Sequence, residues 1–155
     1  MRDKEFRDLY SKVASTVSIV CVRSSERTLH ASTISSLGSA SVEKETQKVL
    51  FVLRSNSRTG RCIKNSKEFS INVLTNTQSQ LAILFSEEFT QAEIESHISY
   101  KEEIPILEGA LFTLICTLDS IVEVDSNEMI IAKVEFASYL ESSSKPLIYR
   151  NREYS

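Results

Sequence analysis

Two short segments carry the side chains best suited to bind a ligand. Residues 33–41 read Thr-Ile-Ser-Ser-Leu-Gly-Ser-Ala-Ser and place small hydroxyl groups along an otherwise apolar region. Residues 57–59 read Ser-Arg-Thr and lie where a helix is predicted to begin, among Arg54, Arg61 and Lys64. Hydroxyl groups can hydrogen-bond to the edge of a heterocyclic ring, and a basic helix N-terminus can bind a phosphate. The two segments therefore favour a ligand that joins a ring to a phosphate, such as flavin mononucleotide (FMN).

Each segment also has an ordinary structural interpretation. The hydroxyl-rich stretch is consistent with a solvent-facing strand, because Thr is common in strands. Arg58, Arg61 and Lys64 are spaced i, i+3 and i+6, which is typical of the solvated face of a short helix. The concentration of these charges beside Ser57 and Thr59, in a protein of net charge -3, favours phosphate binding.

Composition narrows the class of protein. The chain has 155 residues, 41% hydrophobic and 25% charged, which predicts a single domain over residues 1–155. No run of Lys and Arg is long enough to follow a nucleic acid, so we expect no nucleic-acid partner. No apolar stretch approaches the roughly 20 residues that span a membrane. Residues 1–5 lack the apolar core of a signal peptide, so we expect a cytoplasmic protein.

Cysteine and histidine residues give no sign of a metal site. Cys21, Cys62 and Cys116 are far apart, which favours buried, reduced thiols; a reactive Cys62 beside the phosphate site is the alternative. His30 and His97 have no partners at ligand spacing, so no metal is predicted.

The residue patterns predict at least seven strands and about three helices. Helices are expected at 6–13, at 58–65 after capping residues 55–57, and after a second cap at 75–77. Strands are expected at 16–22, 29–37, 49–53 (as a central strand), 69–74, 110–124, 129–140 and 146–149, with a hairpin tip at 125–128. Residues 87–103 are acidic and are interpreted as a surface excursion. Because strands and helices do not alternate, the patterns favour a mainly β protein, a closed or nearly closed barrel with helices outside.

The order of seven motifs resembles the flavin reductase family, which has an FMN-binding split β-barrel. The motifs are T-I-S-S-L-G-S-A-S (33–41), V-L-F-V-L-R (49–54), S-R-T (57–59), F-S-I-N-V-L (69–74), L-A-I-L-F-S (81–86), I-P-I-L-E-G-A (104–110) and P-L-I-Y (146–149). Within that family the chain is most similar to reductase components of two-component aromatic monooxygenases, such as that of 4-hydroxyphenylacetate 3-monooxygenase.

The resemblance implies a homodimer that binds FMN or FAD near the subunit interface. It implies reduction of the flavin by NADH or NADPH, with hydride passing from nicotinamide C4 to flavin N5, and release of reduced flavin to a separate monooxygenase. By motif position, the implied flavin-binding residues are Thr33, Ile34, Ser35, Ser36, Ser39, Ala40, Ser41, Asn56, Ser57, Arg58, Thr59 and Phe85. Asn127, Tyr149 and Arg152 are placed on the nicotinamide side. No catalytic side chain is expected, because the cofactors carry the reaction.

Two positions depart from the family pattern. Residues 42–48 are charged where relatives carry a Pro-Pro pair, and Ser126 and Asn127 stand where relatives carry a Gly-Asp-His turn. Asn127 is therefore interpreted either as a neighbour of the nicotinamide or as a turn residue that tolerates left-handed backbone angles. The chain also has only three glycines and no G-x-G-x-x-G, so a Rossmann loop is excluded. An electron carrier of the flavoredoxin type and a non-enzymatic flavin-binding module remain alternatives.

Overall fold

The computed structural model describes residues 1–141 and 143–155, and these are mainly β-structure with four helices. The helices are α1 (Asp3–Tyr10), α2 (Arg58–Ser66), α3 (Ser79–Ser86) and α4 (Gln91–Glu95). The strands are β1 (Ser15–Thr16), β2 (Ser18–Arg23), β3 (Leu29–Ile34), β4 (Gly38–Val42), β5 (Gln47–Arg54), β6 (Glu68–Val73), β7 (Ile98–Lys101), β8 (Ile104–Leu107), β9 (Phe112–Val124), β10 (Asn127–Tyr139), β11 (Ile148–Arg150) and β12 (Glu153–Tyr154).

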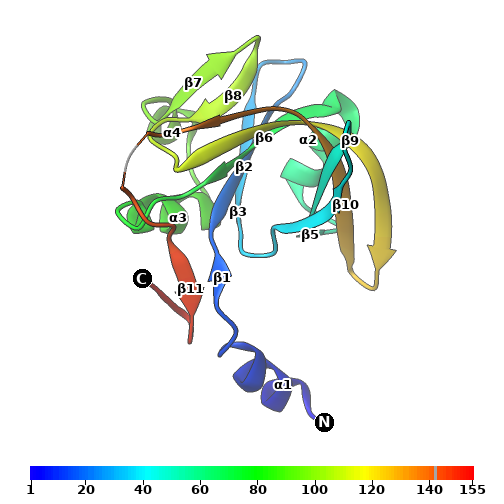
Figure 1. The fold of residues 1–155 in the computed structure, drawn as a ribbon, viewed down its shortest axis with the longest axis vertical. Coiled ribbons are helices and arrows are strands. Elements are labelled where there is room, and N and C mark those ends of the chain that lie inside the picture. Colours follow the sequence, from blue (N-terminus) through cyan, green and yellow to red (C-terminus); the bar gives the residue numbers. More distant parts are fainter. Residues whose placement is uncertain (142) are drawn as a thin grey trace.

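One antiparallel sheet runs in the order β3-β2-β6-β9-β10-β5-β4. Its two edge strands, β3 and β4, are consecutive in the chain and are joined only by residues 35–37. So short a connection requires the sheet to curl until its edges approach, and the twist of antiparallel strands favours this. Figure 1 shows the resulting barrel, with α1, β1 and β11 extending from one end. The predicted mainly β architecture with flanking helices is confirmed.

Strand β2 explains how two hydrophobic clusters share one sheet. Val20 and Val22 belong to a cluster with Phe51 and Phe69, formed by β2, β5, β6, β9, β10 and α2. Cys21, on the opposite face of β2, belongs to a second cluster formed with α3, α4 and β11. Because both faces of β2 are buried, its sequence is an almost unbroken apolar run.

Residues 49–53 form an inner strand of the sheet, as predicted, because β5 pairs with β10 on one side and with β4 on the other; one face of this strand is nevertheless exposed. Strand β5 lies beside the edge strand β4, and the Val52 side chain is 37% exposed. Phe51 and Leu53 face the core, whereas Val52 faces outward. A short apolar run cannot by itself distinguish a strand buried on two faces from one with an exposed apolar face.

The predicted N-cap at residues 75–77 was wrong. Helix α3 begins at Ser79, and Gln78 occupies the cap position without a side-chain cap bond. The Gln78 Oε1 atom instead accepts from the Thr75 amide at 3.0 Å, and the Thr75 and Thr77 hydroxyls bond to each other at 3.0 Å. Thr75, Thr77 and Gln78 therefore use their side chains in hydrogen bonds within this segment, and no side chain caps the start of α3.

The prediction of a surface excursion over residues 87–103 missed two elements. Helix α4 begins with a capping box between Thr90 and Glu93, and it buries Ile94 completely. Strand β7 then pairs with β8. A single buried side chain among acidic neighbours produces no helical periodicity, so the sequence pattern did not predict α4.

The long β9–β10 hairpin is confirmed, but its tip is shorter than predicted. Asn127 already pairs with Val124 inside the hairpin, and Glu128 is buried in β10. Asp125, with a φ of 51°, takes the left-handed backbone of the turn. The interpretation of Asn127 as the left-handed turn residue was therefore wrong.

Candidate functional site

The N-terminus of α2 combines unpaired amide groups with an unpaired cation. Ser57 caps the helix, and its Oγ atom accepts from the Gly60 amide at 3.1 Å. The amide groups of Arg58 and Thr59, and the Arg58 guanidinium, have no hydrogen-bond acceptor or ion-pair partner among the described residues. Free amides at a helix N-terminus carry a partial positive charge. Together with Arg58 they form a site whose chemistry suits a phosphate.

Two predicted site residues hold this helix start in place. Thr59 is buried, and its hydroxyl lies 2.7 Å from the Ser32 hydroxyl on β3. The next residue of β3, Thr33, donates from its hydroxyl to the Ala82 carbonyl of α3 at 2.8 Å. In this structure the Thr59 and Thr33 hydroxyls therefore connect α2 and α3 to the edge strand β3, and the backbone amide of Thr59 is the group left free.

The other hydroxyl-bearing residues lie along the neighbouring barrel edge. Ser35, Ser39 and Ala40 are exposed, and Ser41 is half-buried. The Ser36 Oγ atom accepts from the Val52 amide at 2.9 Å, which joins the loop to β5. Strand β4 pairs with β5, and β5 leads directly to the start of α2. The structure therefore places the two predicted segments on connected elements, whereas Ile34 is buried in the core.

The structure also brings Asn127 to the approach of α2. Asn127 pairs with Arg54 at the end of β5, and the Ser126 carbonyl accepts from the Ser55 amide at 3.0 Å. One residue further, Glu128 pairs with Lys64 of α2 at 2.5 Å. Asn127 is thus held near the loop that contains the exposed Asn56, a few residues before the helix.

Three predicted residues lie apart from this group. Phe85 is only 2% exposed and packs against Phe89 in the second cluster. Tyr149 packs against Tyr154 in the same cluster, at the end of the molecule that carries α1. Arg152 donates to Asp8 of α1 at 2.6 Å. Within one chain, these residues do not join the N-terminus of α2.

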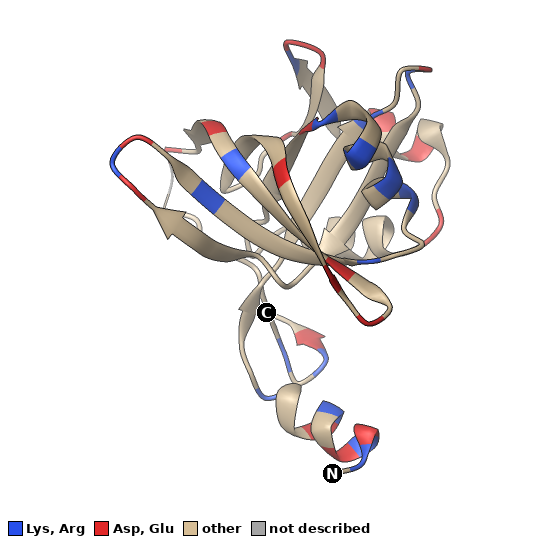
Figure 2. Cartoon of the chain, turned by 90° about the vertical axis from the view of Figure 1, so that its right-hand side faces the viewer, with Lys and Arg blue, Asp and Glu red and all other residues tan. Residues whose placement is uncertain are grey.

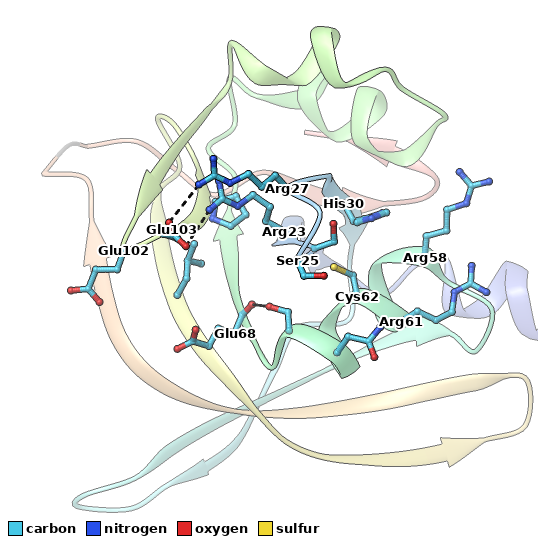
Figure 3. Close-up of a pocket in the computed structure, with 15 residues that line it drawn as sticks. Arg23, Ser25, Arg27, His30, Arg58, Arg61, Cys62, Glu68, Glu102 and Glu103 are labelled. Atoms are coloured by element: carbon cyan, nitrogen blue, oxygen red, sulfur yellow. Dashed lines mark hydrogen bonds and ion pairs between the residues drawn. The ribbon is translucent and has the colours of Figure 1, made fainter.

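A groove of about 750 Å³ along α2 was missed by the sequence analysis. Its walls are α2, the β2–β3 turn and the β7–β8 turn, as Figure 3 shows. The lining residues are Arg23, Ser24, Ser25, Arg27, His30, Arg58, Arg61, Cys62, Asn65, Ser66, Glu68, Glu102, Glu103, Ile104 and Pro105. Residues 58, 61, 62 and 65 have the i, i+3, i+4, i+7 spacing of one helix face. This spacing is the sequence signal from which the groove could have been predicted.

Burial and charge in the groove favour the neutral forms of His30 and Cys62. Burial, followed by the positive charges of Arg58 and Arg61, lowers the pKa of His30 below its usual 6.5. Burial raises the pKa of the Cys62 thiol, which argues against the reactive-thiol alternative. Cys21 and Cys116 are buried free thiols whose pKa values burial raises to about 12. The prediction of buried, reduced cysteines is confirmed.

Comparison with known proteins identifies the family. Residues 10–155 match the model of the flavin reductase like domain, and the chain belongs to this family. No curated protein matches the chain. With the matching solved structures it shares the split-barrel fold, so the predicted fold class is confirmed.

Three solved structures illustrate the likeness. A proposed flavin reductase from Haemophilus somnus 129PT is 26% identical, with a TM-score of 0.89 over 100% of this chain and 99% of that one. The styrene monooxygenase flavin reductase of Pseudomonas putida S12 is 21% identical, with a TM-score of 0.88 over 97% and 96%. An NADH:FAD oxidoreductase of Streptomyces globisporus, in complex with NAD and FAD fragments, is 18% identical, with a TM-score of 0.87 over 99% and 92%.

Two further features of the described residues bear on function. No helix in residues 1–141 or 143–155 has both the length and the apolar character needed to cross a membrane. In the same residues, His, Cys, Asp and Glu side chains form no group able to hold a metal ion.

Proposed function

We propose that this protein is an NAD(P)H:flavin oxidoreductase that supplies reduced flavin to a separate monooxygenase. Membership of the flavin reductase like family supports the reaction class. The observation that supports particular residues is the N-terminus of α2, where the Arg58 and Thr59 amides and the Arg58 guanidinium have no partner among the described residues. This helix start follows β5, the strand that is bonded to Ser36 and pairs with β4.

The residues at this site suit the phosphate and the ring of a flavin, and each residue would make a particular contact. The amides of Arg58 and Thr59 would donate to the phosphate, and the Arg58 guanidinium would neutralise its charge. The backbone and hydroxyls of the exposed Ser35 and Ser39 and of the half-buried Ser41 would hydrogen-bond to the polar edge of the ring. Asn127, held beside Arg54, would hydrogen-bond to the nicotinamide as a neutral donor and acceptor.

A flavin and a nicotinamide held by these residues would themselves supply the chemistry, hydride transfer from nicotinamide C4 to flavin N5. The chain contributes position and charge rather than a reacting side chain. It fixes the phosphate at a rigid helix start, which Ser57 caps and which Thr59 connects to β3. Such fixed positioning lowers the entropic barrier to hydride transfer between the two bound ligands.

The test is anaerobic stopped-flow mixing of the protein with FMN or FAD and then with NADH or NADPH. We expect loss of flavin absorbance near 450 nm together with nicotinamide oxidation, over many turnovers per protein. A flavin that stays bound and is reduced only once would support the electron-carrier alternative. Absence of nicotinamide oxidation with every combination would contradict the proposal.

We also propose that the protein acts as a homodimer. Helix α1 buries none of its own residues, and Phe6, Leu9 and Tyr10 form one apolar face at i, i+3 and i+4, with the exposed Val13 three residues beyond the end of the helix. These side chains are about half exposed, and Figure 1 shows the helix projecting from the barrel. A second copy of the chain would cover this face.

The test of the homodimer is sedimentation of the wild type and of Leu9→Glu. We expect the wild type to sediment at twice 17.5 kDa. The variant should sediment as a monomer with its barrel intact, and a wild-type monomer at micromolar concentration would contradict the homodimer.

The partner oxygenase is proposed by analogy. The Pseudomonas relative is the flavin reductase of a styrene monooxygenase. We propose an aromatic substrate for the oxygenase served here, 4-hydroxyphenylacetate 3-monooxygenase being the system suggested by the motifs. Coupled assays with purified oxygenases would identify it, because only a matched pair converts nicotinamide oxidation into hydroxylated product.

A further inference from the structure

A largely buried ion pair joins helix α2 to the start of strand β10. The Lys64 Nζ atom lies 2.5 Å from the Glu128 Oε1 atom, and the Glu128 side chain is only 8% exposed. Among residues 1–141 and 143–155, no other hydrogen bond or ion pair connects α2 with β10. Figure 2 shows Lys and Arg on the helix and Asp and Glu at the end of the hairpin, so the two elements carry opposite charges.

The Glu128 carboxylate needs this cation. Glu128 pairs with Leu53 of β5 and with Glu123 of β9. Residues directly opposite each other in a sheet share a face, so a second carboxylate is the cross-strand neighbour of Glu128, and like charges in this position repel. Leu53 belongs to the same hydrophobic cluster as Ile63 of α2. A carboxylate buried beside that cluster is destabilising unless a cation pairs with it, and Lys64 is that cation.

The pair connects the two places where ligand contacts are proposed. Lys64 is part of the same helix as Arg58, at whose amide the flavin phosphate would bind. Glu128 directly follows Asn127, the proposed nicotinamide contact and the first residue of β10. Backbone hydrogen bonds fix the geometry of a helix and of a paired strand. The ion pair therefore sets where Asn127 lies relative to the start of α2.

Other contacts of these elements do not make this connection. Backbone pairing holds Asn127 to Arg54, the last residue of β5, but the loop of residues 55–57 separates β5 from α2. Thr59 connects the start of the helix to β3 and not to the hairpin. The ion pair thus supplies the directional contact between the helix and the hairpin.

We propose that Lys64 and Glu128 are positioning residues for the nicotinamide substrate, because their ion pair holds Asn127 where it can bond to a nicotinamide that lies against the flavin. This inference rests on the proposed function, which places a ligand contact at each of the two elements. The pair contacts neither ligand and acts through Asn127. Its loss should weaken the nicotinamide contact and leave the phosphate site at the start of α2 intact.

The test is a double-mutant cycle of Glu128→Gln and Asn127→Ala, because Gln keeps the shape of the Glu side chain and removes its charge. Steady-state kinetics give kcat and KM for NADH or NADPH, and fluorescence titration gives the affinity for FMN. Glu128→Gln should raise KM about two- to tenfold, as expected for Asn127→Ala, with kcat and FMN affinity within about twofold of the wild type. In the Asn127→Ala background, Glu128→Gln should raise KM no further.

Two further variants complete the cycle. Lys48→Met is the matched control, because it breaks an ion pair with Asp119 of similar exposure, between strands that β10 already joins by backbone pairing. Its KM should match that of the wild type. Lys64→Met/Glu128→Leu removes both charges and leaves none buried without a partner, so it serves the test if Glu128→Gln does not fold. It should raise KM as Glu128→Gln does.

Hydrogen exchange gives a measurement that needs no ligand. The Ser55 amide donates to the Ser126 carbonyl at the hairpin tip, at 3.0 Å. If the ion pair holds the tip against α2, this amide should exchange faster in Glu128→Gln than in the wild type.

The remaining outcomes separate this inference from the proposed function. Additive increases of KM in the cycle, or an unchanged KM in Glu128→Gln or in Asn127→Ala, would overturn the inference and leave flavin reduction standing. A loss of FMN affinity as large as the rise in KM would overturn it too, because the pair would then only support the fold of α2. So would unchanged exchange of the Ser55 amide in an active enzyme. A wild type that oxidises no nicotinamide would contradict the proposed function and this inference with it.

Discussion

Arg58 and Arg152 were both predicted to contact a nucleotide, and the structure gives them different surroundings. Arg58 stands at the start of α2 without an ion-pair partner among the described residues, beside two free amides. Arg152 stands in the turn before β12 with a φ of 63°, and it donates to Asp8 at 2.6 Å. The residue type is the same, but only Arg58 has a charge available to a ligand.

A positive charge must be unpaired, as well as present, before it can readily bind a phosphate. An arginine already bound to a carboxylate must give up that contact before it can bind a phosphate, which offsets much of the gain. A helix start with free amides adds several donors that no single side chain supplies. Arg58 is therefore the expected ligand contact, whereas Arg152 connects α1 to the C-terminal strands.

The largest expected effect is that of Arg58→Ala on flavin affinity. Removing a charge-assisted hydrogen bond typically costs about 1.5–3 kcal/mol, or roughly 10- to 100-fold in affinity. We expect that loss for FMN and a much smaller loss for riboflavin, which has no phosphate. Fluorescence titration of both ligands measures it.

Riboflavin serves as the internal control for this experiment. If Arg58→Ala weakens FMN and riboflavin equally, Arg58 contacts the ring or merely supports the fold, and the comparison with Arg152 loses its basis.

Much of the fold followed from local patterns. The apolar run of β2, the polar–apolar alternation of β6, the Ser57 cap of α2 and the paired β9–β10 strands each have a local chemical cause that the sequence displays. The misplaced elements depend on distant partners. Nothing within residues 87–103 shows that Ile94 is buried against another part of the chain.

The candidate site, like the fold, was predictable only where its signals are local in the sequence. The residues before α2 were found because capping and charge are local signals. The groove was missed because α2, the β2–β3 turn and the β7–β8 turn meet only in three dimensions. Whether a charge is already paired, as in Arg152 with Asp8, depends on residues far apart in sequence, and the sequence alone could not show it.

Asn127→Ala should have the next largest effect, on the nicotinamide substrate. Loss of one neutral hydrogen bond, about 0.5–1.5 kcal/mol, should raise the Michaelis constant for NADH or NADPH about two- to tenfold. Flavin affinity should stay nearly unchanged. Because Asn does not titrate, this position should give no ionisation near pH 6.5 in the rate profile, whereas Asn127→His should introduce one.

Wild-type kinetics for Asn127→Ala at subsaturating nicotinamide would contradict this role. Asn127 would then serve only the β10 pairing with Val124 and Arg54.

Arg152→Ala should leave flavin affinity within twofold of the wild type. Its ion pair with Asp8 is more than half exposed, so its loss should lower the free energy of unfolding by no more than about 1 kcal/mol. Urea denaturation and FMN titration measure the two quantities. A flavin affinity reduced as strongly as in Arg58→Ala would erase the distinction between the two arginines.

The smallest expected effect concerns His30. Burial, followed by the positive charges of Arg58 and Arg61, lowers the pKa of its imidazole below 6.5. The unfolded chain takes up the proton at a higher pH, so the stability contribution is full above pH 6.5 and declines as pH falls toward the folded pKa. Removing a repulsive charge in Arg58→Ala should raise the pKa of His30, and Arg152→Ala should leave it unchanged. An NMR titration of the His30 ring protons measures both, and no change in Arg58→Ala would mean that the two groups are not electrostatically coupled.

A crystal structure of the protein with FMN would show whether the flavin phosphate binds at the start of α2. We expect phosphate oxygens within about 3.2 Å of the Arg58 and Thr59 amide nitrogens, with the Arg58 guanidinium in contact. A phosphate bound elsewhere, for example at Arg152 with its Asp8 contact broken, would contradict the proposed site.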